Sequence, residues 1–154
     1  RLTDFSAGTT FIRLRLWRST LALIREQPLT GVGPDQFLYQ YRSRYILPTA
    51  WEEPNLAHAH NYLLDHWARL GVLGVGIALG MQFAFWRSAW RAHRRLRAAD
   101  PALAALAVGL MAAMAHFMAH GLVDSPFFML DLDYVFALML ALVTSYSALA
   151  SRDS

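Results

Sequence analysis

The chain has 154 residues, a formal net charge of +3 and no cysteine, so it offers neither a disulfide framework nor a thiolate metal site. The hydrophobic share of 56% is high for a soluble domain, and it is concentrated after Asn61, which indicates a membrane protein. The sequence begins at Arg1 in what reads as the middle of a protein, so we expect it to be part of a longer chain.

The polar first part, residues 1–61, is predicted to be an outer loop segment with one amphipathic helix from about Thr10 to Glu26. Pro28 and Gly31 end this helix, and its mixture of arginines with Phe, Leu and Trp favours a position at or near the membrane surface. The GVGPDQF stretch that follows lacks a third glycine and a lysine, which favours a turn over a nucleotide-binding loop.

Three histidines, His58, His60 and His66, stand where the apolar part begins. Asn61 is a good N-cap for a helix starting at Tyr62, which places His60 just before a helix N-terminus. The free N–H groups there favour anions and a neutral imidazole, which could take a proton from a hydroxyl. On spacing alone, a structural histidine is the commoner case. His58 and His60 could form a metal pair, but the loop holds no third ligand at a convincing spacing.

Three apolar segments are each free of Asp, Glu, Lys and Arg over at least 17 residues, which is long enough to cross a membrane. The predicted spans are about 63–86, 102–123 and 132–150. The arginine-rich segment 87–101 is predicted to be a cytoplasmic loop, an interpretation favoured over nucleic-acid binding. Residues 1–61 also hold seven arginines, but a long loop translocates largely regardless of its charge. The predicted fold is therefore an all-α membrane protein with its transmembrane part at 62–154.

Several polar residues and glycines fall within or beside these spans. Asp65 and Arg69 are spaced for an interfacial ion pair. His116, His120 and Asp124 share one face of the second span, where polar contacts with helices outside this chain are favoured over a metal site. The glycines predict close helix packing, and they are Gly71, Gly74, Gly76 and Gly80.

Three motifs follow one another along the chain. In the first, an arginine four residues before a tryptophan leads into P-x-x-G-x-G-x-x-x-F. The second is His-Asn, nine residues, Gly, two residues and Gly, and the third is the stretch HGLVDSPFFMLD. Their order resembles that in the O-antigen ligase and polymerase superfamily of bacterial membrane proteins, and it covers nearly the whole chain. The motif residues are Arg13, Trp17, Pro28, Gly31, Gly33, Phe37, His60, Asn61, Gly71 and Gly74.

This resemblance implies a multi-span, GT-C-like glycosyltransferase in the bacterial cytoplasmic membrane, with the histidine loop facing the periplasm or exterior. Members transfer a glycan from undecaprenyl diphosphate to a hydroxyl of lipid A-core, of a growing polysaccharide or of a protein. The implied partners are therefore the lipid-linked donor, the acceptor and the bilayer. No nucleic acid, no metal and no cofactor are implied.

The resemblance also assigns roles to individual residues. His60 matches the position that activates the acceptor hydroxyl, and direct attack on the anomeric carbon would invert its configuration. Arginines can hold phosphate oxygens with forked, charge-assisted bonds. The expected substrate-binding residues are Arg13, Arg42, Arg44, His58 and Asn61.

Two other interpretations stay open at this point. The chain could belong to a membrane transport or accessory protein that uses the same scaffold without transfer chemistry. The histidines could also be interfacial anchors with no chemical role. A transferase should depend on His60 and Arg13, whereas a transporter should respond more to His116, His120 and Asp124.

Overall fold

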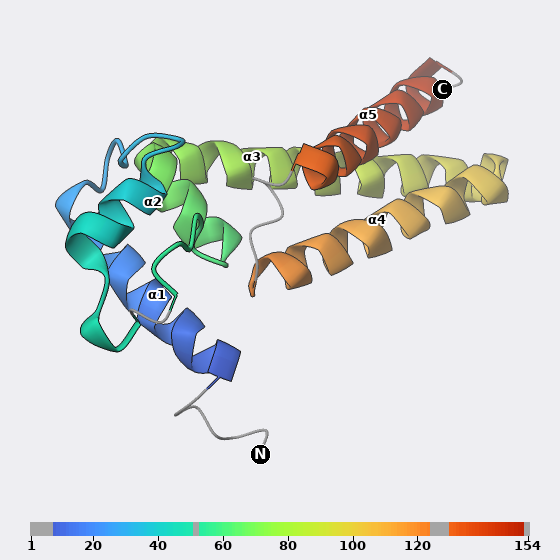
Figure 1. Cartoon of the computed structure of the whole chain (residues 1–154). Helices are drawn as coiled ribbons and strands as arrows, with labels where there is room; N and C mark the ends of the chain where they lie inside the picture. The colour runs from blue at the N-terminus through green and yellow to red at the C-terminus, as the bar shows by residue number, and fades with distance from the viewer. Residues whose placement is uncertain (1–7, 51–52, 124–129, 153–154) are drawn as a thin grey trace. The chain divides into compact units, whose positions relative to one another are not determined.

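The computed structural model describes residues 8–50, 53–123 and 130–152, and over these residues it is helical with no strand (Figure 1). This confirms the all-α prediction. The five α-helices are α1 (Gly8–Glu26), α2 (Phe37–Gln40), α3 (Tyr62–Ala99), α4 (Pro101–Gly121) and α5 (Leu130–Arg152). A π-helical turn, η1 (Tyr41–Tyr45), continues α2, and a 3-10 turn, η2 (Pro48–Ala50), follows it.

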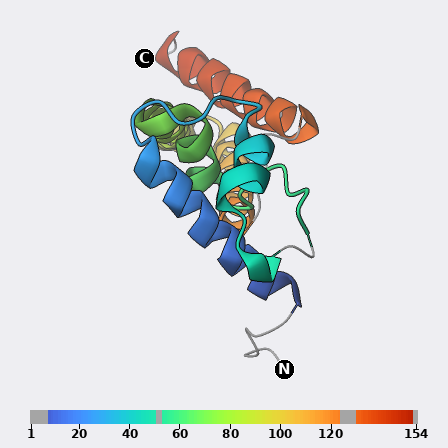
Figure 2. The same cartoon turned by 60° about the vertical axis from the view of Figure 1, so that its left-hand side comes forward.

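The described chain forms two compact units. The first extends to Ile77 and includes Leu122, and the second begins at Ala78. In the first unit, α1 buries one side against α2 and η1, which lie beside it in Figures 1 and 2. The face that we expected at the membrane surface is thus covered largely by the chain itself. The buried core residues are Leu16, Leu23, Ile24, Phe37, Tyr41, Tyr45, Ala59 and Ala68.

α3 is interrupted at Gly71, where φ is 68° and ψ is −162°. Residues with a side chain essentially never adopt this conformation. The interruption leaves carbonyl groups of the preceding turn without helical partners. The loop after α1 supplies N–H donors to these carbonyl groups. The Val32 N–H donates to the Ala68 carbonyl at 2.8 Å, and the Gly33 N–H donates to the Arg69 carbonyl at 2.9 Å.

Pro28 accepts hydrogen bonds from α3, whereas Val32 and Gly33 donate to it. Its carbonyl accepts from the Val72 N–H at 3.0 Å and from the Trp67 indole N–H at 3.0 Å. A Cβ on Gly31 would lie 2.5 Å from the carbonyl carbon of Arg69, so only glycine permits this approach. The P-x-x-G-x-G motif therefore docks by its backbone onto the interruption in α3.

The other glycines of α3 do not pack helices together within the described residues. A Cβ on Gly76 or Gly80 would meet no atom within 4 Å, and a Cβ on Gly74 would meet the Leu70 side chain of the same helix. Close helix packing at these positions therefore stays a prediction. Gly71 has the different role of interrupting the helix.

The arginine-rich segment that we predicted as a loop at 87–101 is helical over most of its length, because α3 continues to Ala99. Arg, Ala and Leu are strong helix formers, and no glycine or proline interrupts the run before Pro101. The Asp100 carboxylate then accepts from the N–H groups of Ala102 at 3.0 Å and Leu103 at 3.1 Å, which caps α4. The side of the membrane on which this segment lies stays a prediction.

The second unit packs the later part of α3 with α4 and α5 (Figure 1). α4 runs back alongside α3, and a smaller cluster of short side chains lies near their connection, formed by Ala92, Leu96, Ala104 and Ala107. The main cluster consists of Phe85, Ala89, Leu110, Met114, Phe117, Phe136, Met139 and Val143.

Two described helices, α3 and α4, are long and apolar enough to cross a membrane, and they contain most of the first two predicted spans. Only 22% of the most apolar window of α4 is buried, whereas the core helix of a soluble protein would be mostly buried. Leu73 and Phe83 of α3 are 73% and 68% exposed, which also favours lipid contact. The described apolar part of α5, Tyr134–Tyr146, is shorter, so the third span stays a prediction.

We expect Gly71→Ala to destabilise the full-length protein strongly. The new Cβ would lie 2.0 Å from the Leu29 carbonyl oxygen, in a backbone conformation that costs a non-glycine residue about 1–3 kcal/mol by itself. Thermal unfolding in detergent, followed by size-exclusion chromatography, measures the effect. Gly76→Ala is the matched control and should be neutral or slightly stabilising, because its site is open and helical. Equal melting temperatures of the two variants would contradict this account.

Candidate active site

Arg13 and His60, which are far apart in sequence, line the same pocket. The pocket has a volume of about 140 Å³ and lies entirely within the first unit. α1 contributes Arg13, the loop before α3 contributes His60, and the segment after η2 contributes Glu53. The remaining lining residues are Thr9, Ile12, Leu16 and Leu56. A guanidinium, an imidazole and a carboxylate thus face one small cavity.

Arg13 has a buried donor that the described chain does not use. Its Nε atom is shielded from solvent and has no hydrogen-bond partner among the described residues. A buried polar donor without a partner is costly, and such groups are rare in folded proteins. Arg13 is therefore suited to donate to an anionic group that enters the pocket.

His60 has a strained backbone. Its φ of 48° makes it the single non-glycine residue with positive φ among the described residues. Histidine adopts this left-handed region at some cost, and residues held in it concentrate at functional sites. The His58 and His60 rings lie 4.2 Å apart between centroids, so the structure brings these two predicted residues together.

Asn61 caps α3, as the sequence predicts. Its side-chain oxygen accepts from the Leu64 N–H at 3.1 Å. Its amide also donates to the Leu122 carbonyl, just beyond α4, at 2.9 Å. The described contacts of Asn61 are therefore structural, and they fix the chain directly after His60.

Trp17 fixes the chain directly before His60. Its indole N–H donates to the Ala59 carbonyl at 2.9 Å, and Ala59 is fully buried. Arg13 and Trp17 lie one helical turn apart on the same side of α1. One helix therefore presents the guanidinium of Arg13 and anchors the loop that carries His60.

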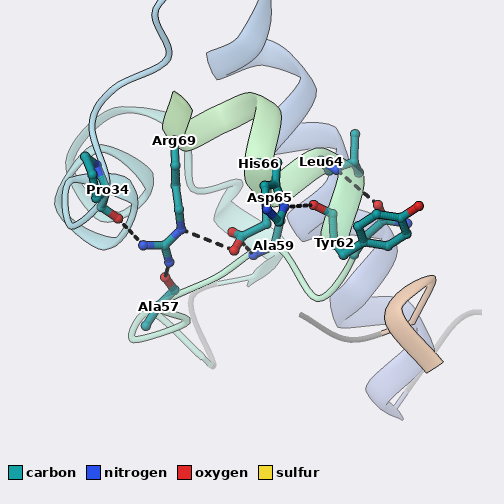
Figure 3. Close-up of polar contacts among 9 residues, drawn as sticks. Pro34, Ala57, Ala59, Tyr62, Leu64, Asp65, His66 and Arg69 are labelled. Atoms are coloured by element: carbon teal, nitrogen blue, oxygen red, sulfur yellow. Dashed lines mark hydrogen bonds and ion pairs between the residues drawn. The ribbon is translucent and has the colours of Figure 1, made fainter. Parts of the chain in front are cut away.

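A buried ion pair between Asp65 and Arg69 also holds this loop (Figure 3). The Arg69 Nε lies 3.2 Å from an Asp65 carboxylate oxygen, and the side chains are 8% and 0% exposed. The other Asp65 oxygen accepts from the Ala59 N–H at 3.0 Å. The i, i+4 pair that we expected does form, and both of its residues are buried within the protein.

The remaining nitrogens of Arg69 join two loops to α3. One Nη donates to the Pro34 carbonyl in the glycine loop, and the other donates to the Ala57 carbonyl in the histidine loop (Figure 3). The guanidinium also lies 5.8 Å from the centre of the Phe37 ring. Arg69 thus satisfies a buried carboxylate and two loop carbonyl groups at once.

The other two predicted phosphate ligands do not line this pocket. Arg42 donates to the Asn55 side chain at 3.3 Å. Arg44 lies 3.6 Å from Glu26 in an exposed ion pair. Glu26 also accepts from the Tyr45 hydroxyl at 2.6 Å, and burial together with this carboxylate raises the pKa of Tyr45.

Tyr41 is a buried residue of η1. Burial raises the pKa of the Tyr41 phenol, and the Glu53 carboxylate raises it further. The hydroxyl is buried and has no hydrogen-bond partner among the described residues. Both effects favour the neutral phenol, so Tyr41 contributes no negative charge to an anion-binding site.

Sequence analysis did not place Glu53, Asp65 and Arg69 at the site. The i, i+4 spacing of Asp65 and Arg69 predicts their contact, but it carries no information about burial or about the two loop carbonyl groups. Glu53 lies in a short acidic loop with no motif, so no signal in the sequence distinguishes it.

The described residues hold no group of three or more metal-ligating side chains. His116 and His120 of α4 stack with their ring centroids 6.5 Å apart. The third member of that predicted set, Asp124, lies outside the described residues, so the role of this set stays a prediction.

A family model described as O-antigen ligase matches residues 2–79. The chain belongs to this O-antigen ligase family. The match includes the whole Arg13–His60 pocket, the Asp65–Arg69 pair and the interruption at Gly71. Searches of curated proteins and of solved structures find no match. Family membership, together with the two apolar helices, indicates a membrane protein with an O-antigen ligase or polymerase type of role.

We expect Arg69→Met to lower the free energy of unfolding by about 3–5 kcal/mol, because it leaves the Asp65 carboxylate buried without its charge partner. Arg44→Met is the matched control. It removes an exposed pair, which contributes only about 0–1 kcal/mol. Thermal unfolding of the full-length protein in detergent compares the two variants. Similar melting temperatures would show that the buried pair does not hold the loops.

Proposed function

We propose that the chain forms the catalytic part of a membrane glycosyltransferase that uses undecaprenyl-diphosphate glycan as its donor. The acceptor would be a hydroxyl of lipid A-core, of a growing polysaccharide or of a protein, at the outer face of the cytoplasmic membrane. The observation that carries this proposal is the shared pocket of Arg13 and His60 within the region that matches the family.

In this proposal Arg13 binds the diphosphate of the donor. Its Nε has no partner among the described residues and is available to an anion, and the guanidinium stays positively charged at any working pH. The positive charge stabilises the diphosphate as it leaves with the electrons of the broken bond. A carboxylate at Glu53 would repel the diphosphate, so we place Glu53 toward the acceptor side of the pocket.

His60 acts as the general base. Its neutral imidazole takes the proton of the acceptor hydroxyl while the acceptor oxygen attacks the anomeric carbon. The new bond joins that carbon to the acceptor oxygen, and the bond from the carbon to the diphosphate oxygen breaks. Attack opposite the leaving diphosphate inverts the anomeric configuration.

The size of the pocket limits what it holds. A volume of about 140 Å³ fits a phosphate or a single sugar hydroxyl with its neighbours, but not a whole lipid-linked glycan. The rest of the donor and acceptor must therefore extend beyond the pocket. We propose Arg42 and Arg44 as contacts for these outer portions, with His58 beside the base and Asn61 holding the loop.

The strain at His60 provides a sharp test of its role. Asn tolerates positive φ but cannot act as a base near neutral pH, so His60→Asn should keep the protein folded. We expect its melting temperature to stay within about 2 °C and glycan transfer to fall about 100-fold or more. In the native host, surface glycan would disappear from a glycolipid gel while lipid-linked donor accumulates.

Two results would contradict a catalytic His60. Normal glycan with His60→Asn at matched membrane levels would make the histidine structural. The transport alternative would be favoured if surface glycan is unchanged in His60→Asn while the amount of lipid-linked glycan changes in His116→Ala or His120→Ala. The stacked rings of His116 and His120 in α4 make these two variants the informative ones.

Arg13 is tested by separating its charge from its shape. Arg13→Gln removes both and should abolish transfer, whereas Arg13→Lys keeps a point charge without the fork and should retain a small part of it. Arg18→Gln is the matched control, because Arg18 is exposed on the same helix and does not line the pocket. Equal glycan levels in Arg13→Gln and Arg18→Gln would remove Arg13 from the mechanism.

A further inference from the structure

A large open groove lies on the second unit, and it shares no residue with the Arg13–His60 pocket. Its volume is about 890 Å³. It lies beyond the residues that match the family model. Two chemical classes of side chain line it. The apolar wall consists of Phe83, Trp86, Trp90 and Met111, and the basic wall consists of Arg87, Arg91, Arg94 and Arg95.

Helical spacing explains why these side chains meet. Arg87, Arg91 and Arg95 recur every four residues and form one stripe along α3. Trp86 and Trp90 form the neighbouring stripe. The basic side chains lie toward the C-terminal end of α3, and Phe83, which is 68% exposed, lies at the apolar end of the groove. The groove therefore has an apolar side and a basic side, and its apolar side extends further toward the N-terminal end of α3, to Phe83.

Within the described residues, no acidic side chain forms an ion pair that neutralises the positive charge of the groove. Asp100 is the single acidic residue in the sequence between Asp65 and Asp124, and its carboxylate caps α4. Four guanidinium groups beside an apolar surface are suited to an anionic partner that also has an apolar part.

We propose that this groove binds one anionic phospholipid. The headgroup phosphate binds among the arginines, and an acyl chain lies along Phe83, Trp86 and Met111. α3 and α4 are both apolar enough to cross a membrane, so the apolar end of the groove lies at hydrocarbon depth and the basic end at the headgroups. A covering protein helix would instead bury several arginines at a high desolvation cost.

The test uses the full-length protein reconstituted in nanodiscs that contain equal amounts of phosphatidylglycerol and phosphatidylcholine. Native mass spectrometry counts the lipids that stay bound after the disc is removed. We expect retained phosphatidylglycerol, and an apparent affinity that falls about fivefold for Arg91→Gln and about 25-fold for Arg91→Gln with Arg95→Gln. Arg97→Gln is the matched control, because Arg97 lies in the same segment but not in the groove.

Further comparisons distinguish a specific lipid site from general surface charge and from a site for free phosphate. Equal retention of the two lipids, or equal losses for Arg97→Gln and Arg91→Gln, would overturn the proposal in favour of general surface charge. Displacement of the lipid by millimolar inorganic phosphate would overturn it in favour of a free phosphate site. Phe83→Ala should weaken binding of long-chain phosphatidylglycerol more than that of its dihexanoyl form, and equal effects would remove the acyl-chain contact.

Replacement of Trp90 by a photoreactive residue tests the remaining alternative, which is that a protein helix covers the groove. We expect crosslinks to phospholipid in native membranes, and a crosslink to another protein segment would overturn the proposal. Glycan transfer is measured separately in each variant. The lipid site can therefore fail while the transferase proposal stands, and the reverse can also occur.

Discussion

The buried pair of Asp65 and Arg69 is the interaction on which the first unit depends. A charged pair with side chains 0% and 8% exposed is stable only when its remaining donors and acceptors are satisfied, and here two loops supply the partners. The same contacts that satisfy Arg69 hold the glycine loop and the histidine loop against α3. Ordering of the glycine and histidine loops and burial of the Asp65–Arg69 pair are therefore coupled, because each depends on the contacts of Arg69.

The interruption at Gly71 makes this arrangement possible. A continuous helix would use the Ala68 and Arg69 carbonyl groups internally, and the glycine loop would have no backbone acceptors to dock on. The motif glycines at 31 and 71 are thus explained by close approach of two backbones. Two further contacts position His60 itself. Trp17 holds the chain directly before it, and Asn61 holds the chain directly after it.

The sequence alone predicted the helical class, the N-cap at Asn61, the start of α3 and the ion pair between Asp65 and Arg69. These features depend on local spacing and residue type, which a single sequence contains. Burial of the ion pair, the role of Gly71 and the presence of Glu53 in the pocket depend on which segments meet in space. The segment predicted as a loop at 87–101 is helical for a different reason: the end of the apolar run marks the end of a span, but arginine, alanine and leucine continue the helix to Ala99.

The position of Arg13 and Trp17 on one helix also constrains how the chain can change in length. Each inserted residue turns a helix by about 100°, so a single insertion between them would move the guanidinium out of the pocket while the indole stayed on the histidine loop. The separation of these two residues is therefore fixed by helical geometry. The segment from Glu53 to Asn55 is under no such restriction, because it lies outside the helices and reaches the pocket through Glu53. Within this family, insertions should be tolerated in the second segment and excluded from the first.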